Sequence, residues 1–404
     1  MLLLYGFMNI ESRLPTKNEL LSEFFAHWHS PSPRTEKIKT GDSCGRVLAK
    51  DFFALCDNPV FRSSMMDGVA VKSSEFTAGA PDASLWKIDV DYVFTDTGDD
   101  FPDEFDAVIR IEDVEILPNG GLRLSDNLKT VKSGTLVNPK GKNLTKGALV
   151  GRKGDILTPG GLAALAMGAV SEVEVCAKPR VVFVPTGSEL IPLGSLPARG
   201  KTMDANSVMA KALLEQMGAE AIIYPIAKDD RETLSKMLDK ALSEADAVIL
   251  NAGSSKGVED YNYTLLEERG EFFIHGVAAL PGKPLAMAVI DGKPVINVAG
   301  PPVSCFNGLD WCTRAIVRRL LGLPELVRAK VDAALTAPII HKTGARYESI
   351  IRLNVELSDG NYTATPVPHW TESPADVLRT NGLYVTKFPP EQTEAGNVIE
   401  VELL

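Results

Sequence analysis

The stretch "ADAVILNAGSSKGVEDYNY", residues 245–263, joins an apolar run to a loop of small residues that ends in two acids. A short apolar run without alternation is typical of a parallel strand that is buried on both faces. Glycines and serines let backbone N–H groups approach an anion such as phosphate closely. Glu259 and Asp260 would repel that phosphate unless a divalent cation lay between the charges. The stretch therefore indicates a phosphate and Mg²⁺ site, and the alternative is an ordinary turn after a strand.

Strands and helices alternate around this stretch, from about residue 179 to Pro324. The runs "RVVFVP" (180–185) and "EAIIYPIA" (220–227) predict further strands, and "NSVMAKALLEQMG" (206–218) predicts a helix that ends at Gly218. A second helix is predicted over 229–245, with Asp229 and Glu232 as its capping pair. A strand pair within 285–300 and a helix within 308–322 complete the pattern. The alternation predicts a doubly wound α/β domain.

The segments on either side of this domain do not show the strand–helix alternation. Thr16 and Glu19 form the pattern of a capping box, so a helix is predicted from Thr16 to about His29. Residues 31–176 read as short β-like runs with one short helix within 157–170, and the chain after Pro324 is again β-like. The predicted fold is multi-domain α+β. Its domains are 1–57 with 141–178 (an N-terminal helix and a discontinuous β lobe), 58–140 (an inserted second lobe), 179–326 (α/β) and 327–404 (a C-terminal β-domain).

Composition excludes several classes of partner. The chain has 404 residues, 45% of them hydrophobic, which is enough for several packed cores. A net charge of -11 without a basic stripe argues against nucleic acid or an anionic membrane as the main partner. No apolar run approaches the roughly 18 to 20 residues that span a bilayer. The five cysteines form no C-x-x-C pair, so a cytoplasmic protein without a zinc site is expected.

Three loops follow predicted strands at their carboxyl ends: "PTGSEL" (185–190), "NAGSSKGVED" (251–260) and "AGPPVS" (299–304). In open α/β sheets, ligands bind outside the carboxyl ends of the strands, where the strand order switches. The three loops together therefore predict one ligand site at this edge of the sheet.

The loops resemble, in order and spacing, those of the molybdopterin molybdenumtransferase family, the MoeA and gephyrin E-domain proteins. The segment "FRSSMMDGVAV" (61–71) is similar to that family's Ser-x-Met-Asp-Gly-Tyr-Ala motif. Nearly the whole chain takes part in the resemblance, which identifies it as a divergent member. The other matching segments are "GRVLAKD" (45–51), "TGDDFPDEFDAVIRIED" (97–113), "VPTGSEL" (184–190), "MDANSVMAKALLEQMGAE" (203–220), "HGVAALPGKP" (275–284) and "TNGLYVTKFP" (380–389).

The resemblance implies a MogA-like, molybdopterin-binding α/β domain and a homodimer. In this family the ligand cleft lies between the α/β domain of one subunit and the second lobe of its partner. The implied activity belongs to molybdenum cofactor biosynthesis: with Mg²⁺, adenylylated molybdopterin and molybdate, or tungstate, yield the cofactor and AMP.

The resemblance also implies roles for particular residues. Catalysis would rest on Asp67, Glu189, Asp204 and Asp260, of which the last three would hold Mg²⁺. The pterin nucleotide would contact Thr97, Glu112, Thr186, Gly187, Gly253, Ser254, Ser255, Gly257 and Pro302. Molybdate would be bound by Lys283, Ser304, Thr371 and an arginine of "GARYESIIR", either Arg346 or Arg352. Two alternatives stay open, because Asp204 also fits a helix N-cap and Asp67 a turn-forming Asp-Gly pair.

Four loops depart from the family pattern. Ser188 replaces an acid, "KGALV" (146–150) lacks two more, Asn251 begins "NAG" instead of "SGG", and "AGPP" (299–302) replaces Pro-Gly-Asn-Pro. If the missing acids organise the metal, each loss would cost about tenfold or more in rate. Two functions therefore remain: the molybdenum-inserting enzyme, or a molybdopterin-binding paralogue that serves as a carrier, sensor or scaffold. A generic nucleotide-binding enzyme is disfavoured, because both glycine-rich phosphate-loop signatures are missing.

Overall fold

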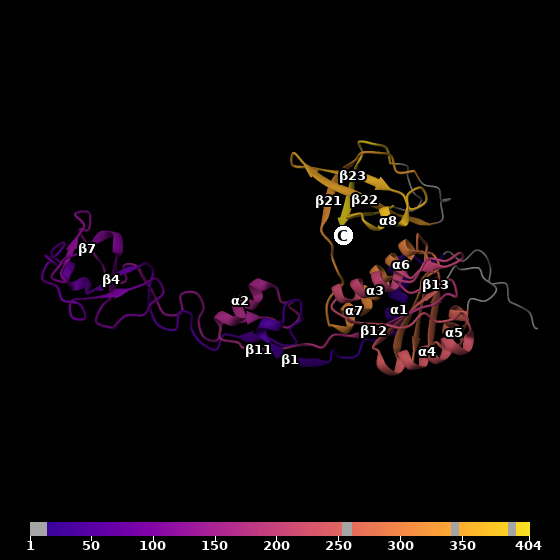
Figure 1. Cartoon of the computed structure of the whole chain (residues 1–404), viewed down its shortest axis with the longest axis horizontal. Helices are drawn as coiled ribbons and strands as arrows, with labels where there is room; N and C mark the ends of the chain where they lie inside the picture. The colour runs from indigo at the N-terminus through magenta and orange to yellow at the C-terminus, as the bar shows by residue number, and fades with distance from the viewer. Residues whose placement is uncertain (1–13, 253–260, 341–346, 387–392) are drawn as a thin grey trace, which may run out of the picture. The chain divides into compact units, whose positions relative to one another are not determined.

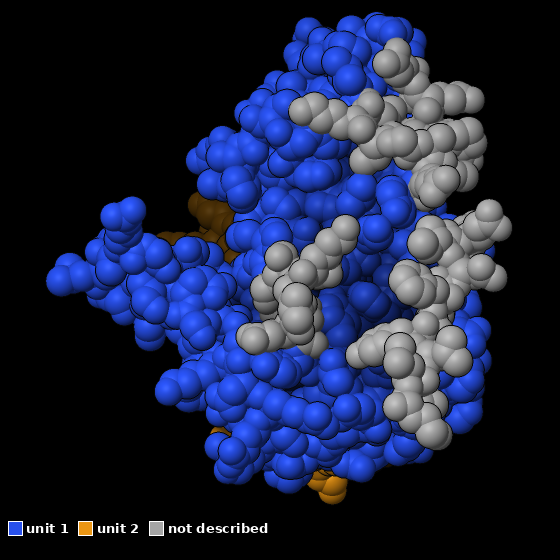
Figure 2. Space-filling model, turned by 90° about the vertical axis from the view of Figure 1, so that its right-hand side faces the viewer, with its two compact units in different colours: residues 1–33, 177–404 blue, residues 34–176 orange. Residues whose placement is uncertain are grey.

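The computed structural model describes residues 14–252, 261–340, 347–386 and 393–404. They form two compact units (Figure 1, Figure 2). The larger unit contains residues 1–33 and 177–404, and the smaller unit contains residues 34–176. None of the helices in the described ranges combines the length and hydrophobicity that crossing a bilayer requires.

A six-stranded sheet forms the centre of the larger unit. Four neighbouring strands are parallel, and two antiparallel strands extend one edge. Val181, Val182, Phe183 and Val184 are fully buried, as the unbroken apolar run predicts. In spatial order the strands are β15 (Glu220–Ile223), β12 (Arg180–Pro185), β16 (Ala247–Ala252), β20 (Lys293–Ala299), β19 (Ala286–Ile290) and β17 (Phe272–His275). The predicted doubly wound α/β domain is confirmed.

Helices cover both faces of this sheet (Figure 1). On one face, α4 (Arg231–Glu244) and α5 (Tyr261–Arg269) pack Leu238 and Leu266 against Val182 and Leu250. On the other face lie α3 (Ala205–Gln216) and the chain of α6 (Pro302–Gly308), η4 (Leu309–Thr313) and α7 (Arg314–Leu320), which contact one another and the strands. The helix predicted over 308–322 thus begins earlier, at Pro302, and contains a π-helical segment at η4. Two short strands, β13 (Leu190–Ile191) and β14 (Thr202–Met203), pair beside α3.

The capping pair predicted for α4 is wrong. Asp230, not Asp229, is the N-cap, and it accepts bonds from the N–H and the hydroxyl of Thr233, both at 2.8 Å. Asp230 has the extended backbone of an N-cap, and Thr233 is the residue three positions on that a cap contacts. Asp229 therefore takes no part in capping α4. Glu232 forms an ion pair with Lys236 on the exposed surface.

The N-terminal helix α1 (Lys17–His27) begins with the predicted capping box between Thr16 and Glu19. It packs within the larger unit, whereas the sequence had grouped it with the first β lobe. Trp28 is 1% exposed and its Nε1 donates to the Gly292 carbonyl at 3.1 Å. Aromatic packing between Phe24 and Phe272 places α1 against β17.

The C-terminal part of the larger unit is a small barrel-like β-domain with its own core around Leu353, Ala364 and Val401. Its sheet closes because β22 pairs with β23 and also with β24. The predicted turn lies at Asp359 and Gly360, both with positive φ. Its strands and helix are β18 (Ala279–Leu280), β21 (Lys330–Leu335), β22 (Glu348–Ser358), β23 (Asn361–Val367), α8 (Pro374–Leu378), β24 (Gly382–Val385) and β25 (Val398–Leu403).

The smaller unit is mainly β and contains separate hydrophobic cores. One core packs Leu48 and Val173 against Leu165 of the predicted short helix α2 (Pro159–Met167). Its elements are β1 (Thr35–Lys39), η1 (Thr40–Asp42), β2 (Phe52–Phe53), β10 (Leu149–Gly151) and β11 (Glu172–Cys176). The remaining elements are β3 (Ser63–Ser64), β4 (Gly68–Val71), η2 (Ser73–Phe76), β5 (Tyr92–Thr95), β6 (Ala107–Arg110), η3 (Ile111–Asp113), β7 (Val114–Ile116), β8 (Leu122–Leu124) and β9 (Val137–Asn138).

Candidate functional site

Asn251, at the carboxyl end of β16, joins the loops that follow three parallel strands. Its side-chain Nδ2 donates to the Ala299 carbonyl at 3.0 Å, at the end of β20. Its main-chain carbonyl accepts hydrogen bonds from the N–H and the hydroxyl of Thr186, each at 2.9 Å. Thr186 is the residue that follows β12. Asn206 of α3 donates to the Asn251 Oδ1 at 2.9 Å and to the Gly300 carbonyl at 2.7 Å. The side chain and the main-chain carbonyl of one buried residue, Asn251, therefore hold the starts of the three predicted loops together.

The loop after β12 turns back on itself at Gly187. This residue has φ +149°, a conformation that residues with a side chain rarely adopt. A Cβ added there would lie 2.7 Å from Oε1 of Glu189, so the Glu189 carboxylate occupies the space that a side chain would need. Thr186, Gly187 and Glu189, all predicted as site residues, are thus packed at the same strand end.

Asp229 belongs to this cluster and was missed as a site residue. Burial raises the pKa of Asp229, and the neighbouring Glu189 carboxylate raises it further, while the Ser188 N–H and the nearby Thr186 hydroxyl act in the opposite direction. Two carboxylates that repel each other at the carboxyl end of a sheet are a typical place for a cation. The doubled acid "DD" was the available signal, because only one of two adjacent aspartates can cap the following helix.

Asp204 is buried, at 7% exposure, and caps α3 by accepting a bond from the Ser207 N–H at 3.0 Å. The N-cap alternative is therefore confirmed, while its metal role stays a prediction. No three His, Cys, Asp or Glu side chains in the described ranges gather to hold a metal ion. Five further predicted site residues, Gly253, Ser254, Ser255, Gly257 and Asp260, lie outside the described residues.

Arg352 of β22 is a buried guanidinium with unused donors. It is 2% exposed and stacks on Phe306 of α6, with its Cζ 4.3 Å from the ring centroid. Its Nε and Nη1 have no hydrogen-bond partner among the described residues. Burial lowers the pKa of Arg352 to about 10, although the Asp310 carboxylate acts in the opposite direction. A buried cation with two free N–H groups is suited to an oxyanion.

The other predicted molybdate residues that the structure describes, Lys283, Ser304 and Thr371, lie on or near α6 and the C-terminal β-domain. Lys283 is exposed and its Nζ lies 5.0 Å from the ring centroid of Tyr347, just before β22. Pro302 begins α6, Ser304 is half-buried on it, and the adjacent Val303 packs on Val367 of β23. Thr371, after β23, is exposed and donates to the Pro368 carbonyl at 3.3 Å. Arg346 lies outside the described residues.

In the smaller unit, Asp67 and Thr97 are brought together from separate segments. Oδ1 of Asp67 accepts from the Thr97 N–H at 2.7 Å and from its hydroxyl at 2.8 Å, and these bonds lower the pKa of Asp67. The Asp67 carbonyl accepts from the Ile111 N–H at 2.9 Å, which places the turn beside Glu112. A Cβ at Gly68 would lie 1.9 Å from the Ile109 carbonyl oxygen, so the residue after Asp67 must be glycine.

Comparisons with known proteins agree with this architecture. Residues 16–168 match the model of the MoeA N-terminal region (domain I and II), and residues 183–319 match that of a probable molybdopterin binding domain. A molybdopterin molybdenumtransferase of Staphylococcus epidermidis is 25% identical over 411 residues, which cover 98% of this chain and 97% of the relative. Another with that name, from Staphylococcus aureus, is 27% identical over 337 residues, covering 80% of each chain.

Solved structures show the same likeness. The crystal structure of a molybdopterin biosynthesis MoeA protein from Pyrococcus horikoshii has a TM-score of 0.79 and 27% identity, over 97% of this chain and 99% of the other. A second structure of a MoeA protein from that organism, 24% identical with a TM-score of 0.74, has the same fold. With a MoeA N-terminal match over residues 16–168, a molybdopterin binding domain over 183–319 and similarity to these relatives along nearly its whole length, the chain belongs to the MoeA family of molybdopterin biosynthesis proteins.

Proposed function

We propose that the protein acts in molybdenum cofactor biosynthesis as a molybdopterin molybdenumtransferase. It would insert molybdate, or tungstate, into adenylylated molybdopterin with Mg²⁺ and release AMP. The observation that carries this proposal is the junction of three strand-end loops through Asn251 and Thr186, in a chain similar to named transferases along 98% of its length. This edge of the sheet is where a nucleotide's phosphates bind in open α/β folds.

The pterin nucleotide would lie along the loops that begin at Thr186, Asn251 and Gly300. Gly187 makes room for the Glu189 carboxylate at this strand end, beside the proposed position of the phosphates. Bound Mg²⁺ would neutralise charge on the phosphoanhydride that breaks when AMP leaves. Glu189, Asp204 and Asp260 are the predicted holders of the metal, and we add Asp229, whose carboxylate adjoins Ser188 where the family has an acid.

The fit to a cation rests on the repulsion between Asp229 and Glu189. Because burial and Glu189 raise the pKa of Asp229, its ionised form lowers folding stability as pH rises through that raised value. A divalent cation between the two carboxylates would reverse this effect. The two carboxylates therefore lower the folding stability of the metal-free protein, and a bound cation would restore it.

We expect Asp229→Asn to raise the melting temperature of the metal-free protein and to abolish its further rise on addition of Mg²⁺. The advantage of the variant should grow as pH rises from the ordinary aspartate pKa through the raised pKa of folded Asp229, and should then level off. Thermal melts with and without MgCl₂ measure both effects. Glu232→Gln, an exposed change nearby, is the control and should behave as wild type. An equal Mg²⁺ response in Asp229→Asn would remove Asp229 from the metal site.

Molybdate would bind at the junction of α6 and the C-terminal β-domain, near Lys283, Ser304 and Arg352. The two free donors of buried Arg352 support this placement, because a dianion satisfies charged N–H groups that the protein leaves unpaired. Arg346 and Thr371 keep their predicted roles as further donors. Lys283 is exposed enough to change without disturbing the core.

Lys283→Ala is expected to weaken molybdate binding by about 1.5–3 kcal/mol, the usual worth of a charge-assisted hydrogen bond. Pterin binding should be largely unchanged, since Lys283 lies outside the strand-end loops. Isothermal titration with molybdate and with pterin nucleotide separates the two effects, and exposed Lys178→Ala is the control. Equal losses of both ligands would contradict the assignment.

A homodimer is also part of the proposal. Asp67, Thr97 and Glu112 belong to the smaller unit, whereas the loops at the sheet edge belong to the larger one. A cleft shared between subunits, as in the family, would let both sets act on one ligand, and a two-fold dimer would form two such clefts. Light scattering at micromolar concentration should report a dimer, and a monomer alone would count against the shared cleft.

The catalytic prediction concerns Asp67. Single-turnover AMP release with molybdate and Mg²⁺ should fall on the order of a hundredfold in Asp67→Asn, because a charged group near the reacting phosphates acts chiefly on the transition state. Nucleotide affinity should fall much less. Asp82→Asn is a matched control, since Asp82 is also exposed, lies in the same unit and accepts a neighbouring backbone N–H.

The same assay decides between the two candidate functions. Ser188 and the loop at 146–150 lack carboxylates that the family carries there, and this loss favours a paralogue that binds without turnover. Wild-type protein that binds the pterin nucleotide and releases no AMP would establish that binding role. An active wild type with an equally active Asp67→Asn would leave the transferase in place and reject Asp67 as its catalytic residue.

A further inference from the structure

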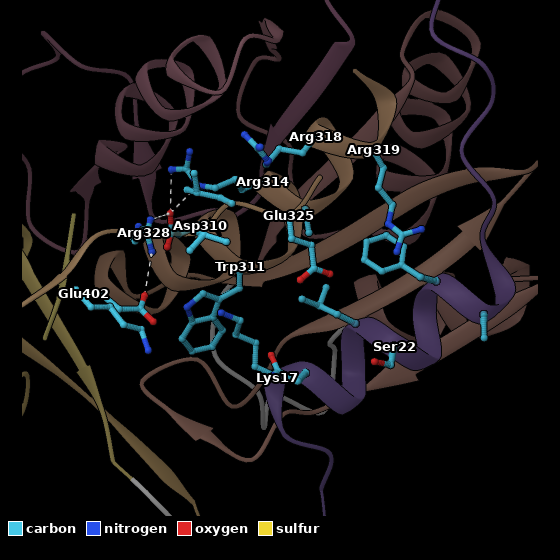
Figure 3. Close-up of a pocket in the computed structure, with 18 residues that line it drawn as sticks. Lys17, Ser22, Asp310, Trp311, Arg314, Arg318, Arg319, Glu325, Arg328 and Glu402 are labelled. Atoms are coloured by element: carbon cyan, nitrogen blue, oxygen red, sulfur yellow. Dashed lines mark hydrogen bonds and ion pairs between the residues drawn. The ribbon is translucent and has the colours of Figure 1, made fainter. Parts of the chain in front are cut away.

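A pocket of about 590 Å³ lies in the larger unit, away from the strand-end loops. It is lined by α1, the η4–α7 helix and the segment 325–330 (Figure 3). Glu402 of β25 closes one end. None of the residues assigned above to the pterin, the metal or molybdate lines it. Its charged lining is mainly cationic: Lys17, Arg314, Arg318, Arg319, Arg328 and Lys330 face Asp310, Glu325 and Glu402. This excess of positive charge occurs in a chain whose net charge is -11.

Two of these arginines share one buried carboxylate. Asp310, whose side chain is 3% exposed, accepts from Arg314 at 2.9 Å and from Arg328 at 2.6 Å. Burial by itself would raise the pKa of Asp310, but Arg328 and Arg314 hold it below its usual range. Arg328 also faces Glu402, at 3.9 Å. One buried negative charge thus supports two guanidinium groups that are each about five-sixths buried.

Arg318 adds a third guanidinium that has no carboxylate partner in the described part of the chain. Its Nε donates to the Pro324 carbonyl, which orients the group without neutralising it. Burial and the like charge of Arg314 lower the pKa of Arg318, and the two arginines are four residues apart on one helix face. Like charges at this spacing destabilise a helix, so the arrangement has a cost that an anion would remove.

The opposite wall of the pocket carries Lys17 from α1. Lys17 lines the same pocket as the arginines, and its side chain extends toward Trp311, with its Nζ 5.9 Å from the ring centroid (Figure 3). Arg319 stacks on Phe25, 3.7 Å from the ring centroid, at the other end of α1. Cations therefore enter the pocket from two helices that face each other.

We propose that this pocket binds a small phosphate-bearing molecule, with Arg318 and Lys17 as the principal contacts from its two walls. Guanidinium groups match phosphate oxygens in paired hydrogen bonds, and the volume is that of a small-molecule site. The ligand would join the α/β part to the C-terminal β-domain, which supplies Arg328, Lys330 and Glu402. The site is independent of the proposed transferase activity.

The test uses pyrophosphate with the full-length protein. Isothermal titration at low ionic strength should show binding that weakens as salt is added, and thermal melts should show stabilisation. Arg318→Glu and Lys17→Gln should each weaken the affinity about tenfold or more, which is 1.4 kcal/mol or more at 25 °C. Arg231→Glu, on α4 on the other face of the sheet, is the matched control and should retain wild-type affinity.

Three results would overturn the proposal. The first is no pyrophosphate binding by wild type. The second is equal weakening in Arg318→Glu and Arg231→Glu, which would mean a diffuse charge effect. The third is binding of an acidic peptide such as oligoglutamate without binding of pyrophosphate. Melts without ligand check that each variant is folded, and Lys17→Gln, a half-exposed change on the opposite wall, keeps the test decisive if Arg318→Glu does not fold.

Discussion

The hydrogen bonds of Asn251 are the constraint on which the edge of the central sheet depends. Asn251 is 2% exposed, and its side-chain amide joins the end of β20 to the first turn of α3. Its main-chain carbonyl accepts from Thr186, which follows β12. A buried amide without partners costs about 1–3 kcal/mol, so the partners on the neighbouring loops are strongly specified. The loops are held at one place because the strands are parallel and end together, and the amide then fixes their spacing. The Asn251 side chain is long enough to reach the Ala299 carbonyl on the adjacent strand, so it stabilises this edge of the sheet.

The carboxylates of the larger unit divide into two groups by what they contact. Asp204 and Asp230 cap helices, and Asp310 is enclosed by two arginines, so their charges are compensated by N–H groups of the fold. Burial and, to a smaller extent, the neighbouring Glu189 carboxylate instead raise the pKa of Asp229. Carboxylates that accept hydrogen bonds or ion pairs stabilise the fold. Two carboxylates that repel each other at a strand end would instead be stabilised by a bound cation. This difference separates structural acids from candidate functional acids that look alike in the sequence.

Buried or partly buried cations of the larger unit are concentrated at two places. The chain is acidic overall, yet the junction of α6 with the C-terminal β-domain holds a buried guanidinium with free donors, and the η4–α7 pocket holds several more. An acidic surface limits nonspecific anion binding, so the proposed anions would be bound by these local cations. Arg352 and Arg328, from the C-terminal part of the chain, contribute one to each place, so the proposed anions would bind where this part packs on the α/β part.

Elements whose signals are local could be predicted from the amino-acid sequence. The capping box at Thr16, the unbroken apolar strands and the Asp359–Gly360 turn depend on residues a few positions apart, and each was predictable for that reason. Convergence of the three strand-end loops was also predictable, since parallel strands end at a common edge. The residues predicted at 253–257 and at 260 are a matter of sequence alone, because they lie outside the described residues.

Features that depend on contacts between distant residues could not be predicted from the sequence. Only the fold shows that Asp230 satisfies the helix end, which leaves Asp229 to face Glu189. It alone places Thr97 on the carboxylate of Asp67, thirty residues away, and packs α1 with a sheet that begins far along the chain. Burial of Arg352 against Phe306 and the gathering of Lys17 with Arg318 likewise follow from packing between separate elements. Sequence patterns report what a residue can do, whereas desolvation and neighbouring charge, which set its pKa and its free donors, exist only once the chain has folded.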